Sequence, residues 1–138
     1  MKIRISYPYL HQDIYTIFFK DDVDILEKYS QIDSTIDLLI FTGGEDISPS
    51  IYNEKNRYSY SNEERDLIEK NIFKRALLYN IKILGICRGH QLINALLGGK
   101  IIQDMFLERG IHHSYIHGVD KEKDIPEIFD NIIEVNSI

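Results

Sequence analysis

The chain has 138 residues, of which 43% are hydrophobic and 28% are charged, and its formal net charge is −6. This composition predicts one globular domain over residues 1–138 and excludes a basic nucleic-acid-binding class, because no cluster of basic and aromatic residues is present. No apolar run is long enough to cross a bilayer, so we expect no membrane partner and a cytoplasmic protein. The single cysteine, Cys87, cannot form an internal disulfide, and a reactive thiol favours a reducing compartment.

The amino-terminal residues predict two closely spaced strands. Residues 2–7 alternate in polarity like a first strand, and residues 14–19 look like the next one. Only residues 8–13 separate them, whereas a parallel crossover needs about a dozen residues or more. We therefore expect a shortened start that lacks the first crossover; a local hairpin is the alternative. Residues 22–29, with acidic side chains in the first turn, predict a short helix.

A continuous apolar run over residues 35–41 predicts a buried strand that ends in a glycine pair. The chain continues as Thr42, Gly43, Gly44, Glu45 and Asp46. Paired glycines at the end of a strand allow backbone N–H groups to point into open space, which an oxyanion hole requires. An ordinary turn is the alternative interpretation.

The middle of the chain predicts a long amphipathic helix over residues 62–79. Ser61 and Glu64 have the spacing of a capping box, and Asn80 is placed to close the helix. Its apolar residues recur at helical spacing: Leu67, Ile68, Ile72, Phe73, Ala76 and Leu77. Arg65 and Asp66 stand in the first turn, either as a solvated helix start or as part of a site.

Residues 81–91 predict a strand that turns sharply into a helix, with Cys87 at the bend. Gly85 to Gly89 has the spacing G-x-C-x-G of a nucleophile elbow, and a helix follows to Gly98. The start of a helix favours a thiolate over a thiol. A lone cysteine is more often a small buried hydrophobic residue. Both glycine motifs follow predicted parallel strands, at the edge where open α/β sheets hold their sites.

The remaining segments predict connections and one last strand. Residues 53–62 are polar and rich in tyrosine, which indicates a loop, and residues 108–123 look like a loop or flap near the site. Residues 126–131 predict a helical turn before a final strand at residues 132–135.

Five segments occur in the order of a known family. They are FTGGEDISPSIY (41–52), ERDLIE (64–69), ILGICRGHQLINALLGGKIIQD (83–104), HHSYIH (112–117) and VNS (135–137). Together they resemble the class I glutamine amidotransferase-like domain, and most closely its gamma-glutamyl hydrolase branch of cysteine peptidases. The resemblance implies a three-layer α/β fold with a mostly parallel open sheet, helices on both faces and a flavodoxin-like order, incomplete at the C-terminal end.

The resemblance also implies roles for individual residues. Cys87 would attack a gamma-glutamyl amide carbonyl and form a glutamyl thioester, without a cofactor or a metal. The backbone N–H groups of Gly44 and Arg88 would hold the oxyanion. The glutamyl group would be bound by Gly43, Gln91, Asn136 and Ser137. For Gln91, a solvated helix position is the alternative interpretation.

The sequence departs from the family in its catalytic base. The family activates its thiol with an H-x-E motif, and none follows Cys87 in these residues. The histidines are His11, His90, His112, His113 and His117. His90 is a poor substitute for the base, since helical neighbours rarely align for proton transfer. His112, His113 and His117 could suggest zinc, but no cysteine or carboxylate is placed to complete a tetrahedral site. We expect an incomplete domain, from a truncated gene, a fragment or a degenerate copy.

Three functions therefore remain open from the sequence. The first is a gamma-glutamyl amide hydrolase whose partner is a small-molecule gamma-glutamyl substrate. The second is a glutaminase subunit that supplies ammonia to a synthase partner. The third is a non-enzymatic or vestigial glutamyl-binding protein. An incomplete sheet would expose an apolar edge, which makes a homo-oligomer a further expectation.

Overall fold

The computed structural model describes residues 1–6, 22–26, 28–57, 59–101, 103, 119–120 and 132–135, and for the last two ranges it describes the backbone alone. Within these ranges, no helix has the length and apolar character needed to cross a membrane.

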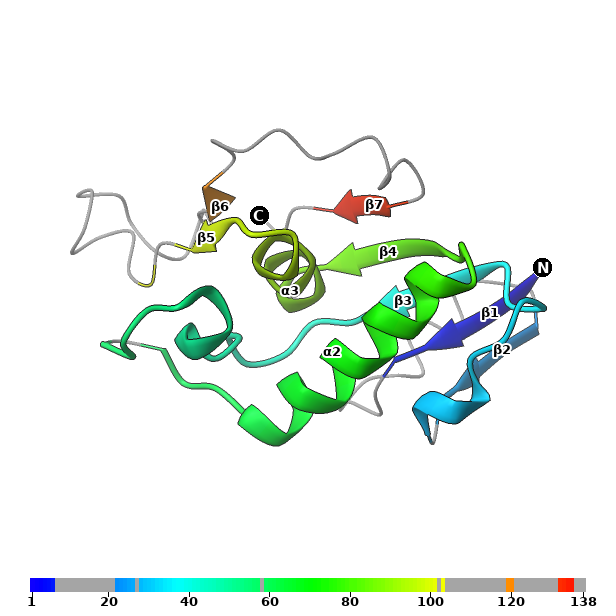
Figure 1. The fold of residues 1–138 in the computed structure, drawn as a ribbon, viewed down its shortest axis with the longest axis horizontal. Coiled ribbons are helices and arrows are strands. Elements are labelled where there is room, and N and C mark those ends of the chain that lie inside the picture. Colours follow the sequence, from blue (N-terminus) through cyan, green and yellow to red (C-terminus); the bar gives the residue numbers. More distant parts are fainter. Residues whose placement is uncertain are drawn as a thin grey trace.

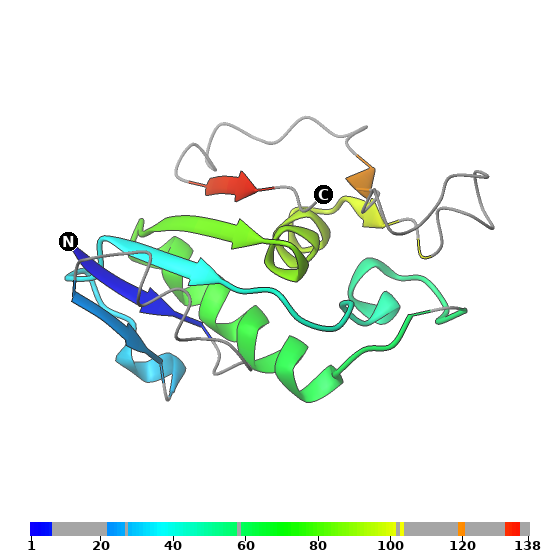
Figure 2. The same cartoon turned by 180° about the vertical axis from the view of Figure 1, so that it is seen from behind.

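A five-stranded parallel sheet forms the centre of the molecule (Figure 1). Its strands are β1 (Lys2–Ile5), β2 (Asp22–Ile25), β3 (Leu38–Phe41), β4 (Lys82–Ile86) and β7 (Ile132–Val135), in the spatial order β2-β1-β3-β4-β7. All four strand pairs are parallel. This order is that of flavodoxin-like sheets, which confirms the predicted α/β class. Figure 2 shows β2 and β7 at opposite ends of the sheet.

The start of the chain differs from the sequence-based prediction. β2 is a strand at Asp22–Ile25, where a helix was expected, and it pairs in parallel with β1. Residues 6–21 separate the two strands, which is enough chain for a crossover, so the expected loss of the first crossover is wrong. Asp22 and Asp24 are exposed while Val23 and Ile25 are half-buried, a period of two that fits a charged edge strand. The strand expected at residues 14–19 lies outside the described residues.

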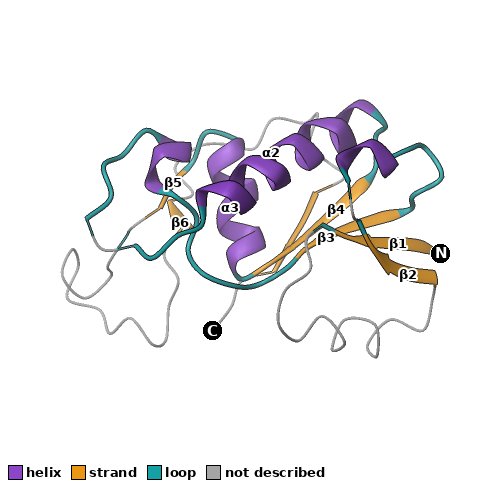
Figure 3. Cartoon of the chain, turned by 90° about the horizontal axis from the view of Figure 1, so that it is seen from below, coloured by secondary structure: helices purple, strands orange, loops and turns teal. Residues whose placement is uncertain are grey.

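Both described α-helices pack on one face of the sheet (Figure 3). They are α2 (Glu63–Leu78) and α3 (Arg88–Leu96), and two short 3₁₀ helices, η1 (Tyr29–Gln31) and η2 (Pro49–Tyr52), lie in the loops. Their main core joins Leu39, Phe41, Ile72, Phe73, Ala76, Ile83, Leu92 and Ile93. The opposite sheet face buries Ile3, Leu38 and Ile40, and neither described α-helix covers it, so the prediction of helices on both faces stays a prediction for this face.

The ends of α2 are set by two asparagines. The Asn62 side chain accepts a hydrogen bond from the Arg65 backbone N–H at 3.0 Å, so Asn62 is the N-cap and the predicted capping box at Ser61 is wrong by one residue. Ser61 instead forms a parallel bridge with Asp46. Asn80, which follows the C-cap residue Tyr79, has a positive φ of 54°, which confirms the predicted end.

The carboxyl-terminal part contains the predicted last strand and one unpredicted ribbon. β7 coincides with the expected strand at residues 132–135 and pairs in parallel with β4. β5 (Lys100–Ile101) and β6 (Val119–Asp120) form a short antiparallel pair that the sequence pattern did not indicate. Apart from β6, the predicted flap at 108–123 and the turn at 126–131 lie outside the described residues.

Candidate functional site

The two glycine motifs meet at the carboxyl edge of the sheet. β3 and β4 are neighbours, and Phe41 pairs with Gly85 at the last position of their parallel register. Beyond this pair one strand continues into Thr42 and Gly43, and the other continues through Ile86 into Cys87. The fold therefore brings together the loop and the cysteine that the sequence analysis assigned to one site.

Cys87 occupies a strained turn between strand β4 and helix α3. Its backbone has φ 53° and ψ −108°, and it is the N-cap residue of α3. A non-glycine residue held in such a sparsely populated region typically costs about 1–3 kcal/mol, and it persists only where the surroundings fix it. Cys87 is a free thiol and is partly exposed, so the alternative of a sealed core cysteine is wrong.

Gly85 and Gly89 are required by close packing around this turn. A Cβ atom on Gly85 would lie 2.5 Å from the Ile93 side chain and 2.8 Å from the Gly89 backbone. A Cβ atom on Gly89 would lie 2.1 Å from the Phe41 carbonyl oxygen. The first turn of α3 therefore rests directly on Phe41, the last residue of β3, after which the Thr42–Gly44 loop begins.

The loop after β3 needs glycine at one position. Gly44 has φ 147°, a conformation that residues with a side chain rarely adopt. Thr42, at the start of the loop, is completely buried. The loop therefore starts from a buried residue and needs glycine at position 44.

A buried arginine from α2 holds the backbone of this loop. Nη2 of Arg65 donates to the carbonyl oxygen of Gly43 at 3.0 Å, and to the hydroxyl and carbonyl oxygens of Thr42 at 3.2 and 3.4 Å. Nη1 of Arg65 donates to Glu45 at 3.4 Å, and its Nε lies 3.4 Å from a carboxylate oxygen of Glu69. The guanidinium therefore connects the loop to the helix.

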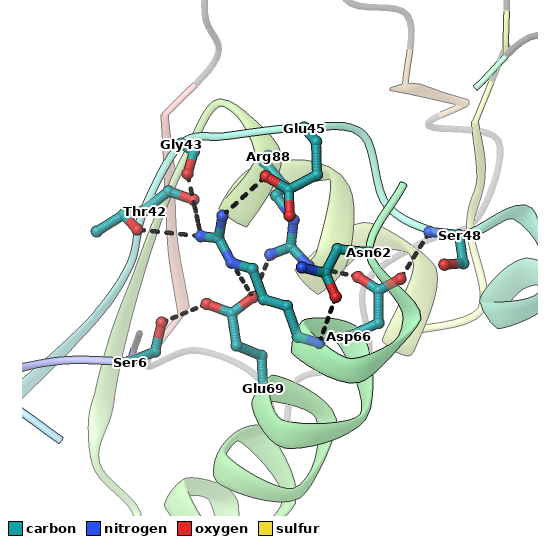
Figure 4. Close-up of polar contacts among 10 residues, drawn as sticks. Ser6, Thr42, Gly43, Glu45, Ser48, Asn62, Asp66, Glu69 and Arg88 are labelled. Carbon is teal, nitrogen blue, oxygen red and sulfur yellow. Dashed lines mark hydrogen bonds and ion pairs between the residues drawn. The ribbon is translucent and has the colours of Figure 1, made fainter. Parts of the chain in front are cut away.

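A second buried arginine ties the Cys87 turn to the same helix (Figure 4). The Arg88 side chain forms ion pairs with Asp66 and with Glu69. Glu69 also accepts a hydrogen bond from the Ser6 hydroxyl at 2.6 Å, and Asp66 accepts one from the Ser48 backbone N–H at 2.8 Å. Asp66 and Glu69 thus join the ends of β1 and β4 to the loop before η2.

This network was missed by the sequence analysis, although the sequence carries a signal for it. Arg65, Asp66, Glu69 and Arg88 are all at most 2% exposed, so the interpretation of Arg65 and Asp66 as a solvated helix start is wrong. The buried face of α2 consists of Arg65, Asp66, Glu69, Ile72, Phe73 and Ala76. These positions follow one helical face, whereas Leu67, which was assigned to the apolar face, is 61% exposed. The signal in the sequence was that charged residues occupy the same helical face as Ile72, Phe73 and Ala76.

Comparison with known proteins gives the family of the chain. The model of the family described as Peptidase C26 matches residues 16–136, which is most of the sequence. The chain belongs to the peptidase C26 family. Its family consists of class I glutamine amidotransferase-like hydrolases, in agreement with the α/β sheet and with the resemblance of the motifs.

Individual relatives are similar to parts of this C26 chain. NtpR of Enterococcus hirae is 44% identical over 51% of the chain and 30% of its own length. YvdE of Lactococcus lactis, which is named as a glutamine amidotransferase-like protein, is 38% identical over 60% of the chain and 36% of its own length. The glutamine-hydrolysing GMP synthase of Dictyostelium discoideum is 27% identical over 86% of the chain and 14% of its own length. The C26 chain thus spans about a third of the first two relatives.

Gln91 of the C26 chain lies in α3, one turn beyond Cys87. It is only 3% exposed, and its Nε2 donates to Asp46 at 3.3 Å, so the alternative of a solvated helix residue is wrong. His90 is also buried. The predicted pocket residues Asn136 and Ser137, and the histidines His11, His112, His113 and His117, lie outside the described residues. Within the described ranges, no three His, Cys, Asp or Glu side chains are grouped to hold a metal ion.

Proposed function

We propose that this chain acts on gamma-glutamyl amides through Cys87 as the nucleophile. The observation that carries the proposal is the strained, partly exposed Cys87 turn, whose helix α3 packs on the end of β3 where the glycine loop begins. This turn has the features of a nucleophile elbow, in which the nucleophile stands at a sharp junction of strand and helix. The sulfur attacks the gamma-carbonyl carbon, the amine leaves, and water then releases glutamate from the thioester.

The neighbouring backbone supplies the groups that such a reaction needs. The N–H groups of Arg88 and Gly44 would stabilise the oxyanion, and the loss of one such donor typically costs about 2.7–4 kcal/mol of barrier. Gly43 and Gln91 would contact the glutamyl group, together with Asn136 and Ser137. Membership of the peptidase C26 family supports an amide hydrolase, and the gamma-glutamyl hydrolase branch is our choice within it.

A second function has one specific observation in its favour. The similarity to a GMP synthase whose name describes it as glutamine-hydrolysing supports a glutaminase subunit. In that case the chain would release ammonia from glutamine for a synthase partner. Activity that appears only after the partner is added would favour this function over independent hydrolysis.

The substrate L-gamma-glutamyl p-nitroanilide tests the proposed chemistry on residues 1–138. We expect intact-mass spectrometry to show one added glutamyl group, with release of p-nitroaniline. No H-x-E follows Cys87 in these residues, so turnover should be roughly 10²–10⁴-fold below the enzyme median of about 10 per second.

The matched control is Cys87→Ser, which keeps the size of the side chain but not the thiol. It should lose both the adduct and the release of p-nitroaniline. Equal release by the variant would show that Cys87 is not the nucleophile, and an unmodified wild-type chain would favour a non-enzymatic glutamyl-binding protein.

A further inference from the structure

Arg65 contacts the one peptide that sets the direction of the Gly44 N–H group. The Gly43 carbonyl, which accepts from Arg65 at 3.0 Å, and the Gly44 N–H belong to the same peptide unit. That unit is planar and trans, so the carbonyl and the N–H point in opposite directions. A hydrogen bond that fixes the carbonyl on one side therefore fixes the N–H on the other side.

Gly44 needs such a constraint because its own backbone offers little resistance to rotation. Glycine adopts positive and negative φ about equally well, and φ at this position is 147°. A peptide next to a glycine can flip, and a flip would turn the N–H to the opposite side. The contact from Arg65 to the Gly43 carbonyl opposes this flip, and its two contacts with Thr42 hold the guanidinium in position for it.

The guanidinium is itself held in place from the helix side. Glu69, which is completely buried, lies 3.4 Å from Nε of Arg65 and also pairs with Arg88. The backbone N–H of Arg88 is the other proposed oxyanion donor. One carboxylate on α2 therefore anchors the segments that carry both donors (Figure 4).

We infer that Arg65 is a positioning residue that aims the Gly44 N–H group as an oxyanion donor. The inference rests on the acyl transfer proposed above and adds a residue that does not contact the substrate. In the step concerned, the Cys87 thiolate attacks the gamma-carbonyl carbon and the carbonyl electron pair moves to oxygen. The C–N bond then breaks, the amine leaves with a proton from water, and the carbonyl reforms as a thioester.

The test compares two reactions of Cys87 that differ in the need for an oxyanion donor. Acylation by L-gamma-glutamyl p-nitroanilide passes through an oxyanion, whereas alkylation by iodoacetamide displaces iodide and forms none. In Arg65→Met we expect the ratio of acylation to alkylation rates to fall about 10²–10³-fold, because one donor is lost. Arg65→Lys keeps the positive charge but lacks the forked donors of a guanidinium. Its ratio of acylation to alkylation rates should lie between those of the wild type and Arg65→Met.

Arg75→Met is the matched control on the same helix. Arg75 also donates to a backbone carbonyl, that of Ile32 at 3.0 Å, but it lies at the other end of α2. This variant should leave the ratio unchanged. If Arg65→Met folds poorly, Thr42→Val removes one acceptor of Arg65 with little change in shape and should lower the ratio in the same direction by a smaller factor.

Residual dipolar couplings give a readout that does not depend on acylation. The N–H coupling of Gly44 should change in Arg65→Met and stay the same in Arg75→Met. Two results would overturn this inference but leave the proposed function standing. One is an unchanged Gly44 coupling in Arg65→Met, and the other is an unchanged ratio in Arg65→Met although the wild type is acylated. A wild type that is alkylated but never acylated would contradict the proposed function, and the positioning role with it.

Discussion

Gly89→Ala should prevent stable folding of the chain or reduce its stability severely. The added Cβ would lie 2.1 Å from the carbonyl oxygen and 2.6 Å from the carbonyl carbon of Phe41, and both atoms belong to the backbone of a central strand. Overpacking usually costs about 1–3 kcal/mol, and we expect at least the upper end because no side chain can rotate away. Urea unfolding followed by circular dichroism measures the loss as a lower midpoint.

Gly99→Ala is the matched control for this effect. The atoms nearest to its added Cβ belong to the Asn94 side chain, at 2.4 Å, and a side chain can move. We expect a clearly smaller loss of stability than for Gly89→Ala. Equal midpoints for Gly89→Ala and the wild type would show that α3 does not rest on β3 as described.

Glu69→Ala should also lower the stability of the fold strongly, because it removes a buried charge that pairs with two buried arginines. Glu69 is completely buried and pairs with Arg65, Arg88 and Ser6. Its removal leaves two buried guanidinium groups with fewer partners, and breaking a buried ion pair in this way costs about 3–5 kcal/mol. The free energy of unfolding from urea titration is the quantity to compare.

Glu64→Ala provides the comparison, because Glu64 is an exposed acid in the first turn of the same helix. Its favourable interaction with the helix dipole is worth about 0.3–1 kcal/mol. Should Glu69→Ala cost no more than Glu64→Ala, the carboxylate would not be the anchor of the network.

The sequence predicted the parts of the fold whose pattern is local. β3, β4 and β7 are short apolar runs, and the turn at Cys87 follows from its two glycines. β2 was missed because its four residues alternate between aspartate and apolar side chains. At a sheet edge this pattern resembles the acidic first turn of a helix. The decision between strand and helix there depends on pairing with β1, which is a tertiary interaction.

The site was predictable only as far as its backbone. The two glycine motifs together, with the family resemblance, pointed to Cys87 and the glycine loop, since both depend on glycine at fixed positions. The side-chain network was not predictable from spacing, because Arg65 and Arg88 are 23 positions apart and are joined through Glu69. Binary patterning treats buried charges as exposed, so it placed Ile72, Phe73 and Ala76 correctly in the core but missed the buried charged residues of α2 and wrongly added Leu67.

The most direct measurement for the proposed reaction is the labelling of Cys87 by a chloromethyl ketone derived from L-glutamine. At neutral pH we expect one adduct in the intact mass, mapped to Cys87, which forms much faster than with the D-enantiomer. It should be absent from the urea-unfolded chain at the same reagent concentration. No adduct, or equal rates for the two enantiomers, would contradict a glutamyl site built around this cysteine.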